Sequence, residues 1–518
     1  MLLTALIYAP SLSWSFGHDQ NVFAEIGALI LKGKLPYLDA WDIKPPNIFY
    51  VYAFAEWLFG QSELAIRLLD WLSIVVTGGL VFHLVSRHAS PESNVSNRIG
   101  LLATFLFAIT AFTLGLADTA QTESFSLLWL VAAAICVYRE QSYARIFLAG
   151  VFLAIAGFFK TTNFVFFLPL AIELLSFPDN RTKRLLLFIA GCGVGSLAEL
   201  GFMWSQGYLL EYLLIARSVF LGHASELAGS PVTVFAVFRI ICVYLGAWLP
   251  IGTIGAVTIF SSRYRRIFAY NVSGRFAAFL LGLLLAGVIG VLVQQKGWGY
   301  HYVILLPGLL PLTALLSYPI LAKVAHVISQ RVPVHPCVVG VALTIFITVI
   351  PLSGARWLHV YYDSALALSN HPKYMTTLGK HNSMYYPPCT ESLAEYLRKH
   401  VPPSESIFIL GQEPGAYWKA NRLPASRYIY TLLFTSPVME QENFDELARS
   451  LSKAAPAVIV VERFDTLAFS GTAATSEGQL LTPKLLGVNT LLHDQYEFAD
   501  IVCDKFLIYS RKPSLAGH

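Results

Sequence analysis

Apolar segments close to membrane length recur along the first 353 residues, and they constrain the fold of this chain more than any other feature. A helix needs about 20 apolar residues to cross a bilayer. Runs that reach or approach this length, some of them short, occupy residues 1–14, 64–86, 99–117, 124–138, 146–159, 163–177, 185–204, 233–260, 276–294, 302–322 and 336–353. The pattern predicts a mainly α-helical, polytopic membrane protein with about eleven transmembrane helices.

Charged residues are too scarce for most other classes of protein. They make up 13% of the chain and apolar residues make up 55%, whereas soluble domains carry roughly 25% charged residues. This composition excludes an ordinary soluble enzyme and a disordered chain. The formal net charge of +4 is too small to indicate a polyanionic partner. We therefore expect membrane lipids, and no nucleic acid, among the partners.

The basic residues that are present mark one side of the membrane. They gather in the loops at 87–98, 139–145, 181–184, 263–275 and 323–331. The positive-inside rule places these loops in the cytoplasm. Each is separated from the next by two predicted spans, as a consistent topology requires. An odd number of spans then places the N-terminus in the cytoplasm and the chain from residue 354 outside.

The first external loop, residues 15–63, carries structure of its own. Residues 21–31 place their apolar side chains on one helical face, and Gly33 follows as a stop. A second apolar stretch, 47–59, contains Glu56 and several aromatic residues. Both stretches are typical of helices that lie in the membrane interface.

The last part of the chain changes character, because charged residues return and helix and strand patterns alternate. The expected helices are 391–400, with Thr390 as N-cap, and 443–455. The expected strands are 407–410, 428–431, 457–461 and 506–509. The domains predicted are a transmembrane domain at 1–353, a linker at 354–374 and a small extracytoplasmic α/β domain at 375–518, which is large enough for its own core.

Two of the six cysteines, Cys389 and Cys503, lie in this external part. An extracytoplasmic compartment is oxidising, so a disulfide between them is one expectation. Two free thiols are the alternative. The other four cysteines lie in apolar stretches and suit small buried residues.

Ionisable residues at the external ends of spans are the functional candidates, since a charge at the bilayer centre costs at least ~2.5–3.5 kcal/mol. The candidates come from five external loops and are Asp19, Asp42, Lys44, Asp118, Lys160, Arg217, Lys296 and His301. Asp39, Glu123 and His223 share these loops but are equally well explained as solvated residues. Carboxylates act as general bases or hold divalent cations, and Lys and Arg suit phosphate. The set predicts a site for a membrane-embedded phosphate ester and an acceptor that loses a proton.

Residues 17–53 bring these groups together in one motif. Asp19 is followed by a turn from Gly33 to Pro36 and by Lys-Pro-Pro at 44–46. This stretch resembles the first external loop of the integral-membrane GT-C glycosyltransferases. The most similar branch includes protein O-mannosyltransferases, the lipid A aminoarabinose transferase and bacterial glycosyltransferases of rhizobial lipopolysaccharide.

Three later stretches, 116–133, 157–170 and 299–316, resemble further motifs of that family in the same order. The chain departs from the family at two positions. Gln20 stands where many members have a glutamate after the catalytic aspartate, and Ile43 separates Asp42 from Lys44 where some members have an acid directly before the lysine.

The resemblance implies that one sugar, a hexose or a pentose, moves from a polyprenyl-phosphate-linked donor to a hydroxyl of a lipid, glycan or protein acceptor. Transfer would occur on the outer face of the bacterial inner membrane, with inversion at the anomeric carbon. Asp19 would be the general base, and Asp118 would position the acceptor or hold a divalent cation. Lys44, Lys160, Arg217 and Lys296 would bind the donor phosphate. Asp42 and His301 would be the ligands of a divalent metal ion, should the reaction use one.

Other functions are compatible with a polytopic membrane protein. The main alternative is a transporter or flippase for a lipid-linked or anionic substrate. Transporters commonly show two related halves, and neither half of this chain repeats the other. An oligosaccharide ligase or polymerase on the same architecture is a nearer alternative. The sugar, the acceptor and the oligomeric state are left open by the sequence.

Overall fold

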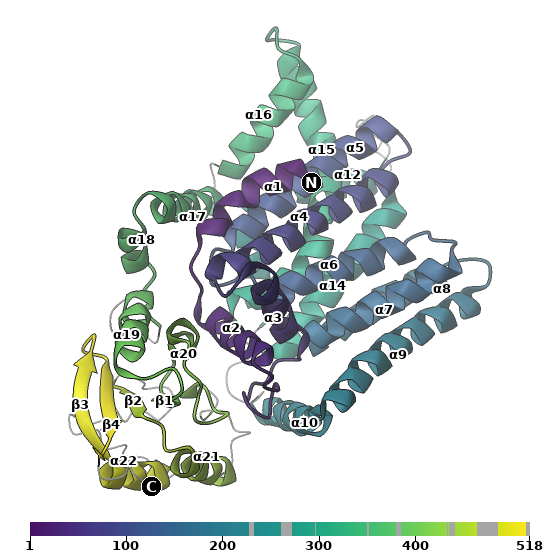
Figure 1. Cartoon of the computed structure of the whole chain (residues 1–518). Coiled ribbons are helices and arrows are strands. Elements are labelled where there is room, and N and C mark those ends of the chain that lie inside the picture. Colours follow the sequence, from purple (N-terminus) through teal and green to yellow (C-terminus); the bar gives the residue numbers. More distant parts are fainter. Residues whose placement is uncertain are drawn as a thin grey trace. The chain divides into compact units, whose positions relative to one another are not determined.

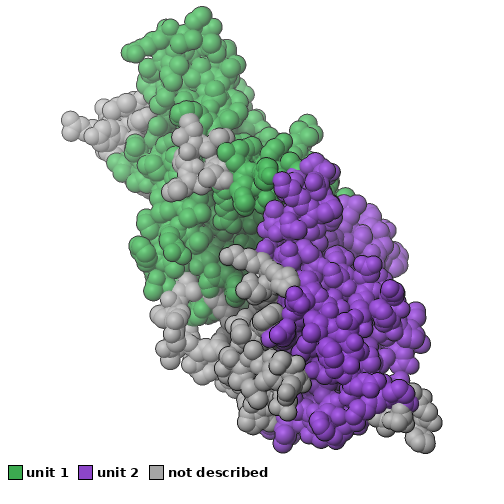
Figure 2. Space-filling view, turned by 90° about the vertical axis from the view of Figure 1, so that its left-hand side faces the viewer, with its two compact units in different colours: residues 1–14, 67–201, 227–365 green, residues 15–66, 202–226, 366–518 purple. Residues whose placement is uncertain are grey.

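The computed structural model describes residues 1–226, 233–260, 272–295, 297–349, 352–379, 385–431, 434, 441–463 and 485–513. The chain divides into two compact units (Figure 2). Unit 1 comprises Met1–Trp14, Arg67–Gly201 and Leu227–Ala365, and unit 2 comprises Ser15–Ile66, Phe202–Glu226 and Leu366–His518. The first external loop and the C-terminal region therefore belong to the same unit, although more than 300 residues separate them in the sequence.

Unit 1 is a bundle of apolar helices (Figure 1). Its described helices are α1 (Leu2–Tyr8), α4 (Glu63–His88), α5 (Ser93–Thr113), α6 (Thr122–Val137), α7 (Tyr143–Phe159), α8 (Phe167–Leu175), α9 (Arg181–Gln206), α11 (Val234–Leu245), α12 (Trp248–Phe260), α14 (Gly274–Gln294), α15 (Leu306–Ser329), α16 (Pro336–Val349) and α17 (Leu352–Ser369). Of these, α4, α9 and α17 have residues in both units. Three short 3-10 helices, η1 (Ala9–Ser13), η2 (Thr161–Phe166) and η3 (Gly299–Leu305), complete the unit.

The predicted spans fall on apolar helices of the structure. Among the described residues, five helices are long and apolar enough to cross a membrane: α4, α5, α9, α14 and Gly299–Ser329. Five shorter apolar helices lie at Leu2–Ser13, Thr122–Val137, Tyr143–Phe159, Thr161–Leu175 and Pro336–Thr348. The remaining predicted span, 233–260, is a pair of helices. The mainly helical, membrane-type architecture is confirmed, and the number of helices that cross the bilayer stays a prediction.

The span expected at 233–260 is not one continuous helix. The structure breaks it into α11 and α12, which are bent by 103°. Gly246 ends α11 with a φ of 50°, in the region that residues with a Cβ rarely adopt. The hydropathy of the segment is continuous, so the bend could not be seen from apolar residues alone.

Helix packing in unit 1 relies on close backbone approach. A Cβ added to Gly150 of α7 would collide with the carbonyl oxygen of Phe188 in α9, and one added to Gly191 would collide with the carbonyl oxygen of Phe147. Small residues at such contacts let helices approach closely enough for van der Waals packing, which holds helices together in lipid. The two glycines thus fix the α7–α9 pair.

Unit 2 combines helices with a small sheet. Its helices are α2 (His18–Leu31), α3 (Asn47–Phe59), α10 (Leu209–Glu226), α18 (His371–Thr377), α19 (Pro387–His400), α20 (Pro414–Ala420), α21 (Gln441–Ala454) and α22 (Leu486–Gln495). Its strands are β1 (Ile407–Leu410), β2 (Val458–Glu462), β3 (Tyr496–Val502) and β4 (Phe506–Arg511), in the order β1-β2-β4-β3. The β1–β2 pair is parallel and the other two pairs are antiparallel. Helices α2 and α3 confirm the helical stretches expected in the first external loop.

The C-terminal region differs from the sequence prediction in several elements. Residues 428–431 are not a strand, and β3 was missed because most of its side chains are exposed. Helix α19 begins at Pro387, four residues earlier than expected, since proline is tolerated in the first turn of a helix. Thr390 is therefore inside the helix, where its hydroxyl donates to Glu413. The expected linker at 354–374 lies in α17 and α18.

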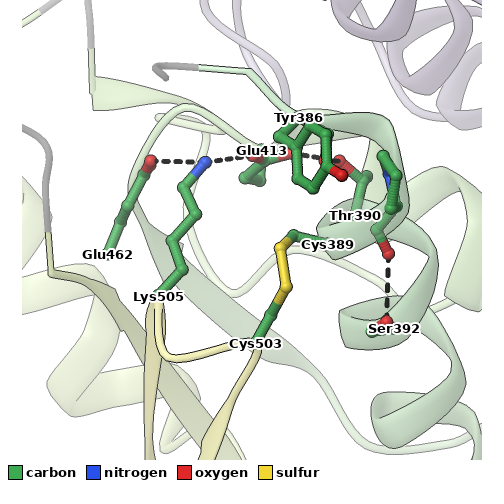
Figure 3. Close-up of a disulfide and its surroundings, with 9 residues drawn as sticks. Tyr386, Cys389, Thr390, Ser392, Glu413, Glu462, Cys503 and Lys505 are labelled. Atoms are coloured by element: carbon green, nitrogen blue, oxygen red, sulfur yellow. Dashed lines mark hydrogen bonds and ion pairs between the residues drawn. A yellow bond between two sulfur atoms is a disulfide. The ribbon is translucent and has the colours of Figure 1, made fainter. Parts of the chain in front are cut away.

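Cys389 and Cys503 form a disulfide that joins α19 to the turn between β3 and β4 (Figure 3). Their Cα atoms are 5.6 Å apart, and 114 residues separate them in the sequence. A bond that closes so long a loop removes conformational freedom from the unfolded chain.

We expect Cys389→Ser to lower the free energy of unfolding of unit 2 by about 2–4 kcal/mol. Urea unfolding of the purified protein, followed by a probe in the C-terminal region, measures this change. Cys337→Ser, at an exposed free cysteine of unit 1, is the matched control. Equal stability of both variants would contradict a stabilising role for the bond.

Candidate functional site

Helix α2 presents Asp19 in its first turn, in unit 2. The backbone N–H of Gly17 donates to the Gln20 side chain at 3.0 Å, which is the half of a capping box that a glycine N-cap allows. Gln20, one of the two departures from the family pattern, is fully buried in this role. The side chain of Asp19 remains 25% exposed. The helix start is thus held by Gln20 while the neighbouring carboxylate stays accessible.

Two nitrogen-bearing side chains flank the Asp19 carboxylate. Lys44 Nζ lies 3.6 Å from Asp19 Oδ2, and His18 Nδ1 lies 3.5 Å from Asp19 Oδ1. Burial would lower the pKa of His18, but the hydrogen bond and the charge of Asp19 outweigh it and raise the pKa overall. The structure therefore unites Asp19 and Lys44, as the loop motif predicts, and it adds His18, which the sequence reading missed.

Asp42 is buried and serves the loop itself. Its Oδ1 accepts the backbone N–H of Lys44 at 2.7 Å, and its Oδ2 accepts the hydroxyl of Tyr430 at 2.8 Å. Burial raises the pKa of Asp42, and the positive charge of Lys44 opposes this shift. Both oxygens of the Asp42 carboxylate thus take part in holding the loop.

The second predicted metal ligand, His301, belongs to unit 1. It is buried in η3 with its ring 4.5 Å from that of Tyr300. Within the described ranges, no three His, Cys, Asp or Glu side chains gather closely enough to hold a metal ion. The metal site at Asp42 and His301 therefore stays a prediction, and no step below uses a metal.

In unit 1, Lys160 pairs with Glu123. Lys160 follows the last residue of α7, and Glu123 lies fully buried in the first turn of α6. The Glu123 carboxylate accepts hydrogen bonds from Lys160 and Thr122. Lys160 Nζ also lies 5.5 Å from the centre of the Tyr300 ring. The interpretation of Glu123 as a solvated loop residue is therefore wrong, because it is the buried partner of Lys160.

Asp118 lies close to η3 in the same unit. Its Oδ2 is 3.8 Å from the guanidinium of Arg356, and a Cβ added to Gly299 would collide with its carboxylate. The stretches 116–133 and 299–316 thus meet at Asp118 and Gly299. The sequence reading missed Arg356 because residue 356 fell in the expected linker.

The remaining candidates are less informative. Arg217 is exposed on α10. Asp39 accepts the backbone N–H of Leu35 and lies 3.5 Å from Lys34, which agrees with a loop residue in contact with solvent. Lys296 and the side chain of His223 lie outside the described residues.

Comparison with protein families points to one class of enzyme. Residues 43–204 match the family model described as dolichyl-phosphate-mannose-protein mannosyltransferase. Over 89 residues the chain is 30% identical to a dolichol phosphate-mannose mannosyltransferase of Haloferax volcanii. That match spans 17% of this chain and only 19% of the relative.

Comparison with solved structures identifies the fold. ArnT from Cupriavidus metallidurans bound to undecaprenyl phosphate superposes with a TM-score of 0.61 at 14% identity, covering 100% of this chain and 98% of ArnT. The oligosaccharyltransferase AglB from Archaeoglobus fulgidus, in complex with an inhibitory peptide and a dolichol-phosphate, gives a TM-score of 0.50 at 12% identity, covering 99% and 74%. The chain has the GT-C fold, and the resemblance seen in its motifs is confirmed.

Proposed function

We propose that the chain is a GT-C glycosyltransferase that moves one sugar from a polyprenyl-phosphate donor to a hydroxyl of a lipid, glycan or protein acceptor. The observation that carries this proposal is the pairing of Asp19 with Lys44 at the start of α2. The fold supports it, since the ArnT structure that covers the whole chain holds undecaprenyl phosphate. Transfer would take place on the outer face of a bacterial inner membrane, with the N-terminus in the cytoplasm.

In the proposed reaction Asp19 is the general base. Its carboxylate takes the proton of the acceptor hydroxyl as that oxygen forms a bond with the anomeric carbon. The bond from the anomeric carbon to the donor phosphate oxygen breaks on the opposite face, so the configuration inverts and polyprenyl phosphate leaves. Lys44, which lies 3.6 Å from Asp19, contributes positive charge near the reacting groups.

The family resemblance assigns Lys160, in unit 1, to the donor phosphate. Its positive charge would offset the negative charge that develops on the departing phosphate, which lowers the energy of the transition state. Glu123 holds Lys160 in place, and Arg356 lies 3.8 Å from Asp118. Asp118 would orient the acceptor. Apolar surfaces of the helix bundle would accommodate the isoprenoid chain.

The role of Lys160 can be tested with a variant that avoids leaving an unpaired buried charge. Lys160→Met alone would leave Glu123 buried without its cation, so the variant to compare is Lys160→Met combined with Glu123→Gln. A hydrogen bond to a charged group contributes about 1.5–3 kcal/mol, so we expect transfer to fall about 10–100-fold. Initial rates at saturating donor provide the measurement, with the exposed Lys183→Met as control. A wild-type rate in the double variant would remove Lys160 from the donor site.

The donor class itself is tested by purification and reconstitution. We expect mass spectrometry of the purified protein to detect a co-purifying polyprenyl-phosphate sugar, and this lipid to support transfer in proteoliposomes. The same assay with a nucleotide sugar and no polyprenyl lipid is the control. Transfer from the nucleotide sugar alone would overturn the proposal.

A further inference from the structure

A segment of the C-terminal region, residues 427–430, runs along the first external loop within unit 2. The backbone N–H of Trp41 donates to the carbonyl oxygen of Arg427 at 2.8 Å, and the Arg427 guanidinium donates to the carbonyl oxygen of Tyr37 at 3.3 Å. Arg427 is itself held by Glu211 at 2.6 Å and by Glu446 at 2.7 Å. The segment is therefore anchored at its start and joined to the loop by one main-chain hydrogen bond and one hydrogen bond from the Arg427 side chain.

Tyr430, at the end of this segment, reaches the Lys44 backbone through Asp42. The Tyr430 hydroxyl donates to Asp42 Oδ2 at 2.8 Å, and Asp42 Oδ1 accepts the Lys44 N–H at 2.7 Å. On the other side, the Lys44 carbonyl oxygen accepts the hydroxyl of Tyr37 at 2.8 Å. Asp42 is only 1% exposed, so little solvent competes for these bonds. The main chain of Lys44 is thus fixed on both sides.

The same tyrosine also contacts the second neighbour of Asp19. Its ring lies 5.8 Å from the His18 ring at an angle of 71°, an edge-to-face arrangement. His18 Nδ1 in turn faces Asp19 Oδ1 at 3.5 Å. Tyr430 therefore contacts His18 directly and reaches Lys44 through Asp42, and these are the two residues that flank the Asp19 carboxylate.

We propose that Tyr430 is a positioning residue that holds Lys44 and His18 against Asp19, so that the C-terminal domain is a working part of this site. The reason is geometric, because a misplacement of about 1 Å in a catalytic group can cost about 10²-fold in rate. The lysine side chain is long and flexible, and a fixed main chain limits where its ammonium group can go. The role in catalysis rests on the proposed function, whereas the placement of Lys44 does not.

Tyr430→Phe tests the proposal, with Tyr428→Phe as matched control. The control removes a hydroxyl from the same segment, but that hydroxyl donates to Glu446 of α21 and not to the loop. We expect Tyr430→Phe to lower kcat about 10–100-fold with little change in the unfolding midpoint, and Tyr428→Phe to retain kcat. In an Asp42→Asn background, Tyr430→Phe should add little further loss, because both changes break the same connection. Full additivity of the two losses, or an unchanged kcat, would overturn the proposal.

A second measurement does not depend on sugar transfer. Lys44 is 18% exposed in its side chain, and acetic anhydride labelling followed by mass spectrometry reports how accessible its ammonium group is. We expect Lys44 to label several-fold faster in Tyr430→Phe than in wild type, and at the wild-type rate in Tyr428→Phe. Equal labelling of Lys44 in all three proteins would overturn the positioning role. Transfer retained by Asp19→Asn would instead overturn the proposed base while leaving the labelling result to decide on Tyr430.

Discussion

Asp19→Asn should lower sugar transfer by about 10²–10⁴-fold, the range that a positioned general base contributes. Asparagine has nearly the same shape as aspartate, but its amide cannot accept the proton of the acceptor hydroxyl. Folding should change little, because the carboxylate is 25% exposed and its contact with Lys44 is a partly solvated ion pair. Initial rates at saturating donor, together with binding of undecaprenyl phosphate, separate loss of chemistry from loss of affinity.

The same loop offers a matched control for this experiment. Asp39→Asn makes the identical change at a carboxylate that accepts the Leu35 N–H and faces the exposed Lys34. We expect this variant to transfer sugar at close to the wild-type rate. Turnover of Asp19→Asn within a few fold of wild type would assign proton removal to another group.

Lys505→Met should destabilise the C-terminal domain by about 3–5 kcal/mol, the usual cost of removing one partner from a buried ion pair. Lys505 Nζ lies 2.8 Å from Glu413 Oε1 and 2.9 Å from Glu462 Oε1 (Figure 3). The three side chains are at most 1% exposed. Methionine fills a similar volume but leaves two carboxylates facing each other without a cation.

The loss of stability in Lys505→Met should depend on pH. Burial raises the pKa of Glu413 even with Lys505 beside it. Without the lysine, the folded domain should bind a proton at Glu413 more readily than the unfolded chain does. The deficit should therefore shrink as the pH falls and grow as it rises.

Urea unfolding at several pH values measures the effect, with the exposed Lys453→Met as control. Replacing Glu413 and Glu462 by glutamine in the Lys505→Met background should recover part of the lost stability, since the buried charges are then gone. A loss below about 1 kcal/mol in Lys505→Met, as for a surface ion pair, would show that the network contributes little.

The C-terminal domain shows where sequence patterns succeed and fail. Strands β1, β2 and β4 were predicted because their buried apolar residues form short continuous runs. Residues 428–431 carry a similar pattern, yet they form no strand. Tyr430 donates to Asp42 of the 15–63 loop, and the Thr431 N–H donates to Gly411, directly after β1. Their apolar character reflects burial, and burial alone does not say which backbone partner supplies the hydrogen bonds.

The sequence by itself determined the fold class of this protein and the loop to which we assign its chemistry. Membrane segments can be recognised from consecutive residues, because they are runs of apolar residues whose length matches the bilayer. The GT-C motifs are equally local, so Asp19 and Lys44 could be named without a structure.

Only the tertiary structure decided which of these side chains contact one another. Glu123 pairs with Lys160, Arg356 approaches Asp118, and Tyr430 bonds to Asp42 across 388 residues of sequence. No periodicity connects positions so far apart, because such contacts depend on how helices, loops and strands pack after each has formed. The partners of the candidate residues were therefore beyond the reach of the sequence, although most of the residues themselves were not.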